Sequence, residues 1–227
     1  MANLVITIDG PAASGKSTIA RLAAQRLGAS FLDTGAMYRA VTLAAINAGV
    51  DMSDQEQLLA VLKKSRFQFA AKEGKMLVLL DGVDVTDQIR SPEVTANARY
   101  IASASKVRGK LVEMQRQFSA KEERIVTEGR DQGTVAFPDA GIKFYLTAHL
   151  TERARRRQAE LHAKGIGSSI EEIQASLEER DRSDQNRTVG PLKIARDAVI
   201  INTTNLSIEQ VVKKILDFVK EKCSKKC

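Results

Sequence analysis

A glycine-rich segment near the amino terminus has the residue types and spacing needed to bind phosphate. It reads Gly10-Pro-Ala-Ala-Ser-Gly-Lys-Ser17 and matches the pattern G-x-x-x-x-G-K-[ST]. Glycines let the backbone curl so that successive N–H groups point at an anion, at the positive end of the following helix. In this pattern the lysine reaches the β- and γ-phosphates, and the serine hydroxyl binds Mg²⁺. The predicted ATP-binding residues are Gly10, Pro11, Ala12, Ala13, Ser14, Gly15, Lys16, Ser17 and Thr18.

The segments around this loop predict the elements that must position it. Residues 4–8 form an apolar run typical of a strand, and residues 15–27 keep one apolar helix face that ends at Gly28. Further along, strands are predicted near 30–32, 125–127, 143–146 and 198–201, with helices over 35–48, 105–120 and from Ser207 onward. This alternation predicts an α/β fold, a three-layer parallel sheet with helices on both faces.

One stretch breaks the alternation of strands and helices. Apolar and polar residues alternate over 64–90, and Gly82 and Asp84 stand where turns would fall, which predicts a small antiparallel insert. Ser91 and Pro92 then predict the cap and first turn of a new helix.

Two residue pairs have the spacing of a capping box, in which each residue bonds the backbone of the other. They are Ser53 with Glu56 and Ser207 with Gln210. The second pair opens the most amphipathic segment of the chain. Its apolar face consists of Ile208, Val211, Val212, Ile215, Leu216 and Val219.

The net charge of +7 indicates an anionic partner, but the charge is unevenly distributed. Residues 213–227 hold six lysines and two acids, a net +4, which leaves +3 for the rest of the chain. We interpret this end, and 220–227 in particular, as a solvated basic tail. Seven Phe, three Tyr and no Trp are few for stacking bases, so a nucleic-acid partner is not expected.

Other features concern the compartment. The longest apolar runs span about five residues, far below the ~20 needed to cross a bilayer, and the first residues lack a secretory signal. Cys223 and Cys227 lie within the last five residues and cannot cross-link a core. We interpret them as free thiols, with metal binding or oxidation as the alternative. A cytoplasmic protein without a membrane partner is expected.

Three further segments carry polar residues in a distinctive order. They are Asp-Thr-Gly-Ala-Met-Tyr-Arg at 33–39, Glu-Gly-Arg-Asp-Gln-Gly-Thr at 128–134 followed by Phe-Pro-Asp at 137–139, and Arg-Asp-Arg-Ser-Asp-Gln-Asn-Arg at 180–187. In order and spacing they resemble bacterial cytidylate kinase, a P-loop nucleoside monophosphate (NMP) kinase. The resemblance implies one kinase domain over 1–227, with an NMP-binding insert at 64–104 and a lid at 151–187.

The activity that the resemblance implies is transfer of the γ-phosphoryl group of ATP, with Mg²⁺, to CMP and dCMP. The acceptor is a phosphate oxygen with a second pKa of about 6, so it is mostly ionised at neutral pH and needs no general base. Catalysis then depends on aligning two anions and offsetting their repulsion with cationic side chains. A sugar- or shikimate-type kinase would instead need a carboxylate to take a hydroxyl proton.

The resemblance also implies roles for single residues. The catalytic set is Lys16, Arg130, Arg153 and Arg157. The substrate-binding set is Thr34, Arg39 and Arg130 at the acceptor phosphate, Arg108 and Asp131 at the cytosine edge, and Arg180, Asp184 and Arg187 at the ribose and phosphates. Ser17 would bind Mg²⁺ directly and Glu128 would do so through water. The spacing of 180, 184 and 187 places them on one face if the helix continues that far.

Each of these residues also has a plain structural interpretation. Arg130 and Asp131 could form a surface ion pair, Arg153 and Arg157 could lie on a solvated helix face, and Arg108 could belong to a charged helix surface. In addition, Arg99 stands where many family members have a base-reading serine. Ser103 or Ser105 could substitute for that serine if the register shifts.

Alternative functions differ in the sequence features that they require. Another NMP kinase, with UMP or AMP as the acceptor, is the main alternative. A GTPase-type switch would need an N-K-x-D element to read guanine, which the sequence lacks. The expected partners are small-molecule nucleotides, and the protein is expected to be a monomer.

Overall fold

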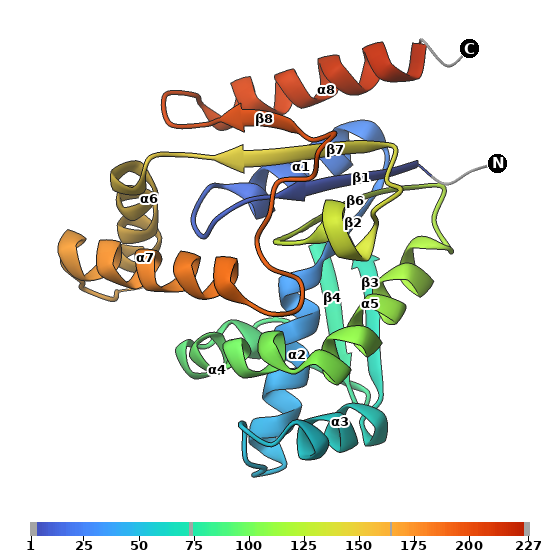
Figure 1. The fold of residues 1–227 in the computed structure, drawn as a ribbon, viewed down its shortest axis with the longest axis vertical. Helices are drawn as coiled ribbons and strands as arrows, with labels where there is room; N and C mark the ends of the chain where they lie inside the picture. The colour runs from blue at the N-terminus through green and yellow to red at the C-terminus, as the bar shows by residue number, and fades with distance from the viewer. Residues whose placement is uncertain (1–3, 73–74, 164, 225–227) are drawn as a thin grey trace.

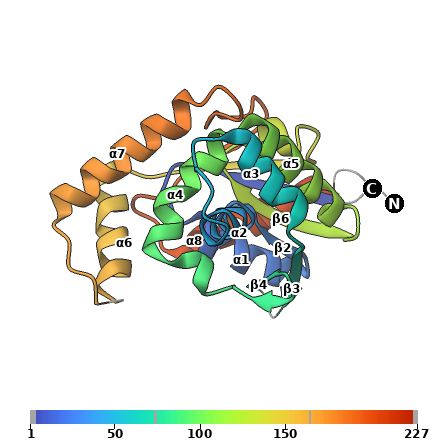
Figure 2. The same cartoon turned by 90° about the horizontal axis from the view of Figure 1, so that it is seen from below.

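The computed structural model describes residues 4–72, 75–163 and 165–224 (Figures 1 and 2). Within them a five-stranded sheet has the order β2-β6-β1-β7-β8. Its strands are β1 (Leu4–Asp9), β2 (Ser30–Asp33), β6 (Arg124–Gly129), β7 (Ile142–Thr147) and β8 (Val199–Asn202). All four pairings are parallel, so the carboxyl ends of the strands meet at one edge.

Helices cover both faces of this sheet, and the predicted α/β fold is confirmed (Figure 1). On one face, α1 (Lys16–Leu27) and α8 (Ile208–Ser224) bury the side chains of Ile19 and Ile215 against the strands. On the other face, α2 (Thr34–Asn47) and α5 (Ser105–Ser119) bury Met37 and Leu111. Burial of these apolar faces, rather than helix propensity, supplies most of the stability of such helices.

The antiparallel insert is also confirmed. It consists of β3 (Phe67–Lys72), β4 (Lys75–Leu80) and β5 (Val83–Asp84), preceded by α3 (Gln55–Lys64) and followed by a 3₁₀ turn (Gln88–Arg90) and α4 (Pro92–Ser103). Met76, Val78 and Leu80 of β4 are buried in the core that α2 shares. Ser91 caps α4 as predicted, because its side chain accepts from the Val94 N–H.

Two helices extend beyond the carboxyl edge of the sheet. They are α6 (Leu150–His162) and α7 (Ile170–Asn186), which lie side by side in both views (Figures 1 and 2). α7 ends at Asn186, and Arg187 has extended backbone angles. The condition stated for a shared face of 180, 184 and 187, that the helix continues through 187, is therefore not met by one residue.

The predicted capping box at Ser53 is wrong. The cap of α3 is Asp54, whose carboxylate accepts from the N–H groups of Glu56 at 2.9 Å and Gln57 at 3.1 Å. Ser53 instead bonds the Asp51 carboxylate through both its N–H and its hydroxyl. A charged acceptor one residue nearer the helix supplies the bonds that Ser53 would have made.

The capping box at Ser207 is confirmed. The Ser207 N–H donates to the Gln210 side chain at 2.8 Å, and the Gln210 N–H donates to the Ser207 hydroxyl at 3.2 Å. The buried face of α8 begins at Val211, whereas Ile208 is 48% exposed.

The predicted amphipathic helix near the end of the chain continues as far as Ser224, so the first residues of the segment interpreted as a tail, 220–224, are its exposed last turn. Ile215 and Val219 are buried, whereas Lys213, Lys214, Lys220 and Lys222 are exposed. The thiol of Cys223 is exposed and free, whereas Cys227 lies outside the described residues. Among the described helices, none is both long and apolar enough to cross a membrane.

Candidate nucleotide site

The predicted phosphate loop joins β1 to α1 at the carboxyl edge of the sheet. Gly10 and Gly15 have φ angles of 152° and 88°, and a side chain on Gly10 would overlap the carbonyl of Leu146. Ala13 also has a positive φ, 56°, which is unusual for a residue with a Cβ. The backbone therefore has the curled form that phosphate binding requires.

The Lys16 side chain lies inside this loop. Its ammonium donates to the carbonyl of Pro11 at 2.6 Å, and only 5% of the residue is exposed. Burial, followed by repulsion from Arg130, lowers the pKa of Lys16 to about 7, although the Glu128 carboxylate raises it. A bound polyphosphate would favour the charged form of this lysine.

Ser17 and Glu128 face each other beside Lys16. The Ser17 hydroxyl donates to Glu128 Oε1 at 2.9 Å, and the hydroxyl of Thr34 donates to the Glu128 carbonyl at 2.7 Å. Burial, with the nearby Asp33 carboxylate, raises the pKa of Glu128. A hydroxyl and a carboxylate are hard oxygen donors of the kind that Mg²⁺ prefers.

Four predicted residues form what we call the arginine cluster: Arg130, Arg180, Asp184 and Arg187. Arg130 Nε donates to Asp184 Oδ2 at 2.6 Å, and Arg187 Nη2 lies 3.0 Å from Asp184 Oδ1. Burial would raise the pKa of Asp184, but these two arginines hold it below its usual value. A single carboxylate thus faces three guanidinium groups.

Arg180 is the least neutralised member of the cluster. Its side chain forms no ion pair or hydrogen bond with the residues that the structure describes. Desolvation, followed by repulsion from Arg130, lowers the pKa of Arg180 to about 10, although solvent still reaches the side chain. An anion bound between Arg130 and Arg180 would relieve this repulsion.

Arg39 contributes from α2 and is joined by an arginine that sequence reasoning missed. Asp33 accepts from Arg39 at 3.4 Å, from Arg90 at 3.1 Å and from the Ala36 N–H at 2.8 Å. Arg39 Nε is buried and has no partner in the described part of the chain. Arg90 lies in the insert, outside any recognisable motif, and its side chain is about half exposed.

Arg108 and Asp131 form a buried ion pair, which brings together the two residues predicted at the cytosine edge. The Arg108 guanidinium also donates to the Ala102 carbonyl at 3.2 Å and lies 5.4 Å from the Tyr38 ring centroid. Gly190, another missed residue, covers the pair. Its φ is 62°, and a Cβ there would overlap both Arg108 and Asp131.

A buried carboxylate shapes the turn that carries Arg130 and Asp131. Asp9, the last residue of β1, accepts from the N–H groups of Gln132 at 2.9 Å and Gly133 at 2.8 Å. Burial raises the pKa of Asp9 to about 6, although these two bonds lower it. A charged residue at the end of an apolar run was the signal that could have identified Asp9.

The two predicted lid arginines have different surroundings. Arg153 is buried and paired with Asp181 at 2.6 Å, whereas Arg157 is partly exposed and pairs with Glu160 of the same helix at 3.1 Å. Arg157 is thus free to reorient toward a ligand, while Arg153 is already held. Their predicted contacts with ATP stay predictions.

A pocket of about 320 Å³ adjoins the arginine cluster. Its lining residues are Ser103, Ser183, Asn186, Arg187, Thr188 and Val189. Arg99 is exposed and stacks over the Tyr100 ring at 5.0 Å, whereas Ser105 is exposed and its N–H bonds Gln55. Of the two serines proposed as substitutes, Ser103 is the one placed beside Arg187.

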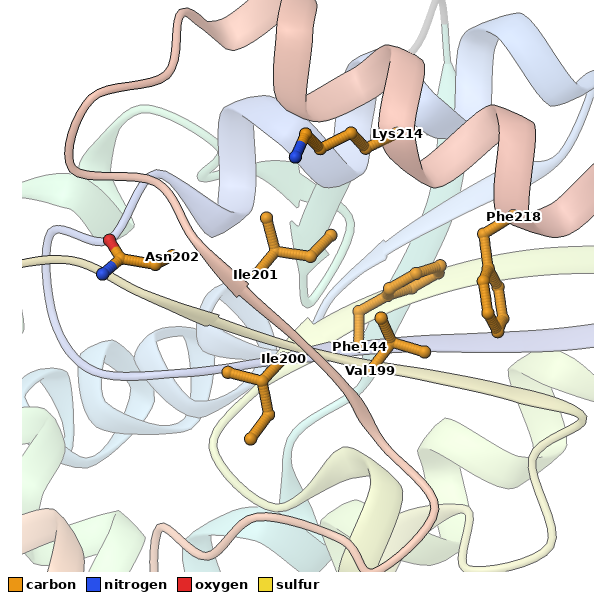
Figure 3. A pocket seen from close by; sticks show the side chains of 7 residues that line it. All are labelled: Phe144, Val199, Ile200, Ile201, Asn202, Lys214 and Phe218. Atoms are coloured by element: carbon orange, nitrogen blue, oxygen red, sulfur yellow. The ribbon is translucent and has the colours of Figure 1, made fainter.

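A second groove, of about 370 Å³, lies between β8 and α8, as Figure 3 shows. It is lined by Phe144, Val199, Ile200, Ile201, Asn202, Lys214 and Phe218. None of the predicted site residues is among them. This groove is therefore separate from the candidate nucleotide site.

Comparison with known proteins decides the family. The family model described as cytidylate kinase matches residues 6–221. The chain belongs to the cytidylate kinase family. A cytidylate kinase of Bacillus cereus is 44% identical over 214 residues, 94% of this chain and 95% of the relative. One from Caldicellulosiruptor saccharolyticus is 43% identical over 217 residues, 96% of each chain.

A solved structure supports the fold alone. An uncharacterized protein from Eubacterium ventriosum superposes with a TM-score of 0.53 at 10% identity, covering 97% of this chain and 99% of the other. Membership of the cytidylate kinase family confirms the resemblance seen in the sequence. The protein is therefore a phosphotransferase.

Proposed function

We propose that the protein transfers the γ-phosphoryl group of ATP to CMP and dCMP. The observation that carries this proposal is the arginine cluster beside the phosphate loop, where Arg130, Arg180 and Arg187 face one carboxylate. An excess of cationic groups next to a triphosphate site suits a second phosphate as the acceptor. It does not suit a sugar hydroxyl, which needs a base.

The proposed reaction depends on aligning the donor and acceptor phosphates. The phosphate loop and Lys16 would hold the donor, while Arg39, Arg130 and Thr34 would hold the acceptor phosphate at the same sheet edge. An ionised acceptor oxygen attacks the γ-phosphorus, and the bond to the β-phosphate oxygen breaks. Arg157 would approach the transferring group as the lid closes, and the positive charges offset the repulsion between the two nucleotides.

Ser17 and Glu128 fit a Mg²⁺ ion, because a hydroxyl and a buried carboxylate already lie together beside the loop. Ser17 would bind the ion directly and Glu128 through water, the usual arrangement in which Mg²⁺ keeps several waters. The ion, when bound, neutralises charge on the β- and γ-phosphates.

The base would be read by Arg108 and Asp131. In the structure they bond each other, so binding would exchange part of this ion pair for bonds to the ligand. Asp131 would accept from the exocyclic amine of cytosine, and Arg108 would donate to the ring acceptors. Uracil presents a carbonyl in place of the amine, and a carboxylate repels it. Ser103 supports the same discrimination from the neighbouring pocket.

The remaining expectations complete this proposal. Asp184, with Arg180 and Arg187, would hold the ribose hydroxyls and phosphates. One domain over 1–227, with the NMP-binding insert at 64–104 and the lid at 151–187, would act as a cytoplasmic monomer on small nucleotides.

A coupled assay with CMP, dCMP, UMP and AMP tests the function. CMP and dCMP should turn over fastest, and faster turnover of UMP or AMP would contradict the proposed acceptor. Asp131→Asn should lower the ratio of kcat/KM for CMP to kcat/KM for UMP, because an amide can donate to the uracil carbonyl. Asp139→Asn, an exposed change in the same loop, should leave the ratio unaltered.

A further inference from the structure

The lid and the phosphate loop are joined at one residue, Ala12. Asp181 of α7 accepts from the Ala12 N–H at 3.1 Å. Arg153 of α6 donates to the Ala12 carbonyl at 3.0 Å and to Asp181 at 2.6 Å. Arg153 and Asp181 are 7% and 9% exposed, so these bonds are shielded from water. Both polar groups of one loop residue are thus held by lid side chains.

The side chain of Ala12 is held as well. It is 4% exposed and belongs to an apolar cluster with Ala154 of α6 and Ile173 and Leu177 of α7. Packing and hydrogen bonds therefore act on the same residue, so the lid helices and the loop are tightly packed against each other at Ala12.

Holding the Ala12 carbonyl fixes the direction of the next N–H. A peptide unit is planar and trans, so the carbonyl of Ala12 and the N–H of Ala13 point in opposite directions. Ala13 has a φ of 56°, a left-handed conformation that is unfavourable for a residue with a Cβ. Such a conformation persists only where the surroundings hold it.

We propose that Asp181 and Arg153 are positioning residues that keep the Ala12–Ala13 peptide in its phosphate-binding form. The placement of the lid thereby controls the affinity for the triphosphate. The Arg153 guanidinium already donates to three oxygens, those of Asp181, Ala12 and Ala148. It therefore acts through the loop rather than on the transferring phosphate. This inference rests on the proposed use of ATP as the donor.

The first test is calorimetric titration of Asp181→Asn with ATP in the absence of an acceptor. Asparagine keeps an acceptor for the Ala12 N–H but loses the charge that holds Arg153, so ATP binding should weaken about tenfold. The KM for CMP should stay within about twofold, because a positioning role on the donor side leaves acceptor binding unaltered. Glu178→Gln removes one charge from an exposed site on the same helix and should behave as the original protein.

A second variant separates positioning from general stability. Glycine adopts a positive φ freely, so Ala13→Gly in the Asp181→Asn background should recover about threefold of the lost ATP affinity. A purely structural defect in the lid would not respond to this change. If Asp181→Asn fails to fold, Arg153→Lys is titrated instead and should also weaken ATP binding, since lysine keeps the charge but is shorter and lacks the Nε–H that donates to the Ala148 carbonyl.

Several outcomes would overturn the inference. These are unaltered or tighter ATP binding by Asp181→Asn, no recovery with Ala13→Gly, or equal losses for ATP and CMP together with a lower melting temperature. The acceptor panel on the original protein decides the proposed function separately, because ATP titration without an acceptor does not depend on which monophosphate is used.

Discussion

The arginines of the proposed lid and those of the proposed acceptor side differ in how they are neutralised. On α6, three of the four arginines have a carboxylate each: Arg153 with Asp181, Arg156 with Glu152 and Arg157 with Glu160. On the proposed acceptor side, Asp33 serves both Arg39 and Arg90, and Asp184 serves both Arg130 and Arg187, whereas Arg108 has Asp131 to itself. Arg180 adds a further positive charge beside them.

The difference indicates where positive charge is left over for a bound anion. A buried guanidinium with a matched carboxylate is neutralised within the fold, and such a pair serves to hold elements together. Unmatched guanidinium groups raise the energy of the ligand-free protein, so their retention indicates that an anion completes the site. The donor side instead relies on backbone N–H groups and Lys16, and it needs fewer side-chain cations.

The largest effect should come from the one lysine at the donor site. Lys16→Ala removes the cation at the β- and γ-phosphates, and we expect kcat to fall by about a thousandfold. Lys214→Ala, an exposed change on α8, should leave turnover normal. The coupled assay checks both proteins, and substantial turnover by Lys16→Ala would show that the loop is not the donor site.

The next effect should arise in the arginine cluster. Arg130→Ala removes the side chain that bonds Asp184, so we expect at least about a tenfold loss of kcat/KM for CMP through the lost clamp. Arg26→Ala, which breaks a surface pair with Glu209, is the matched control and should change kinetics little. Near-normal CMP kinetics for Arg130→Ala would show that the acceptor phosphate binds elsewhere.

The two sides also differ in how far the sequence predicts them. The phosphate loop is contiguous, and its strand and helix are adjacent in the chain, so the donor site could be predicted with its residues. The parallel sheet followed equally well from local alternation. The last helix could be predicted in the same way, because the spacing of Val211, Ile215 and Val219 gives it one apolar face.

The acceptor side depends on contacts between distant segments. Asp9 supports the turn at 132–133 through bonds that span more than 120 positions, and Arg90 meets Asp33 from a different element. Such contacts between residues far apart in the sequence leave no local sequence pattern from which they could be predicted. The role of Gly190 was hidden for the same reason. In the sequence it precedes a proline and indicates only a turn, whereas in the fold it lies over Arg108 and Asp131.

Gly190 therefore offers a smaller but selective test of the acceptor side. A methyl group there would overlap the Arg108–Asp131 pair, so Gly190→Ala should lower kcat/KM for CMP about fivefold and leave ATP binding unaltered. Gly49→Ala is a close control, because Gly49 has a φ of 63° but nothing within 4 Å of the added methyl. It carries the same backbone strain without the overlap. Equal effects of the two variants on CMP kinetics would mean that strain alone is being measured.

The smallest expected effect is the number of protons taken up when a nucleotide binds. This number should differ between ATP, proposed to bind beside Lys16, and CMP, proposed to bind beside the arginine cluster. Lys16 has a pKa lowered to about 7, first by burial and then by Arg130, so in the ligand-free protein at pH 8 it is mostly neutral. ATP favours the ammonium form, and binding at pH 8 should take up close to one proton, whereas at pH 6 the lysine is already charged and uptake should be small.

Titrations in buffers of different ionisation enthalpy measure this uptake. CMP is the comparison at pH 8, because its phosphate is fully ionised there and Arg180, whose pKa burial lowers to about 10, stays charged. Glu128→Gln removes the carboxylate that raises the Lys16 pKa, so uptake with ATP should begin at a lower pH. Equal proton uptake with CMP and with ATP would mean that both nucleotides change the protonation of the same group. The donor and acceptor sides would then not differ in their titrating groups.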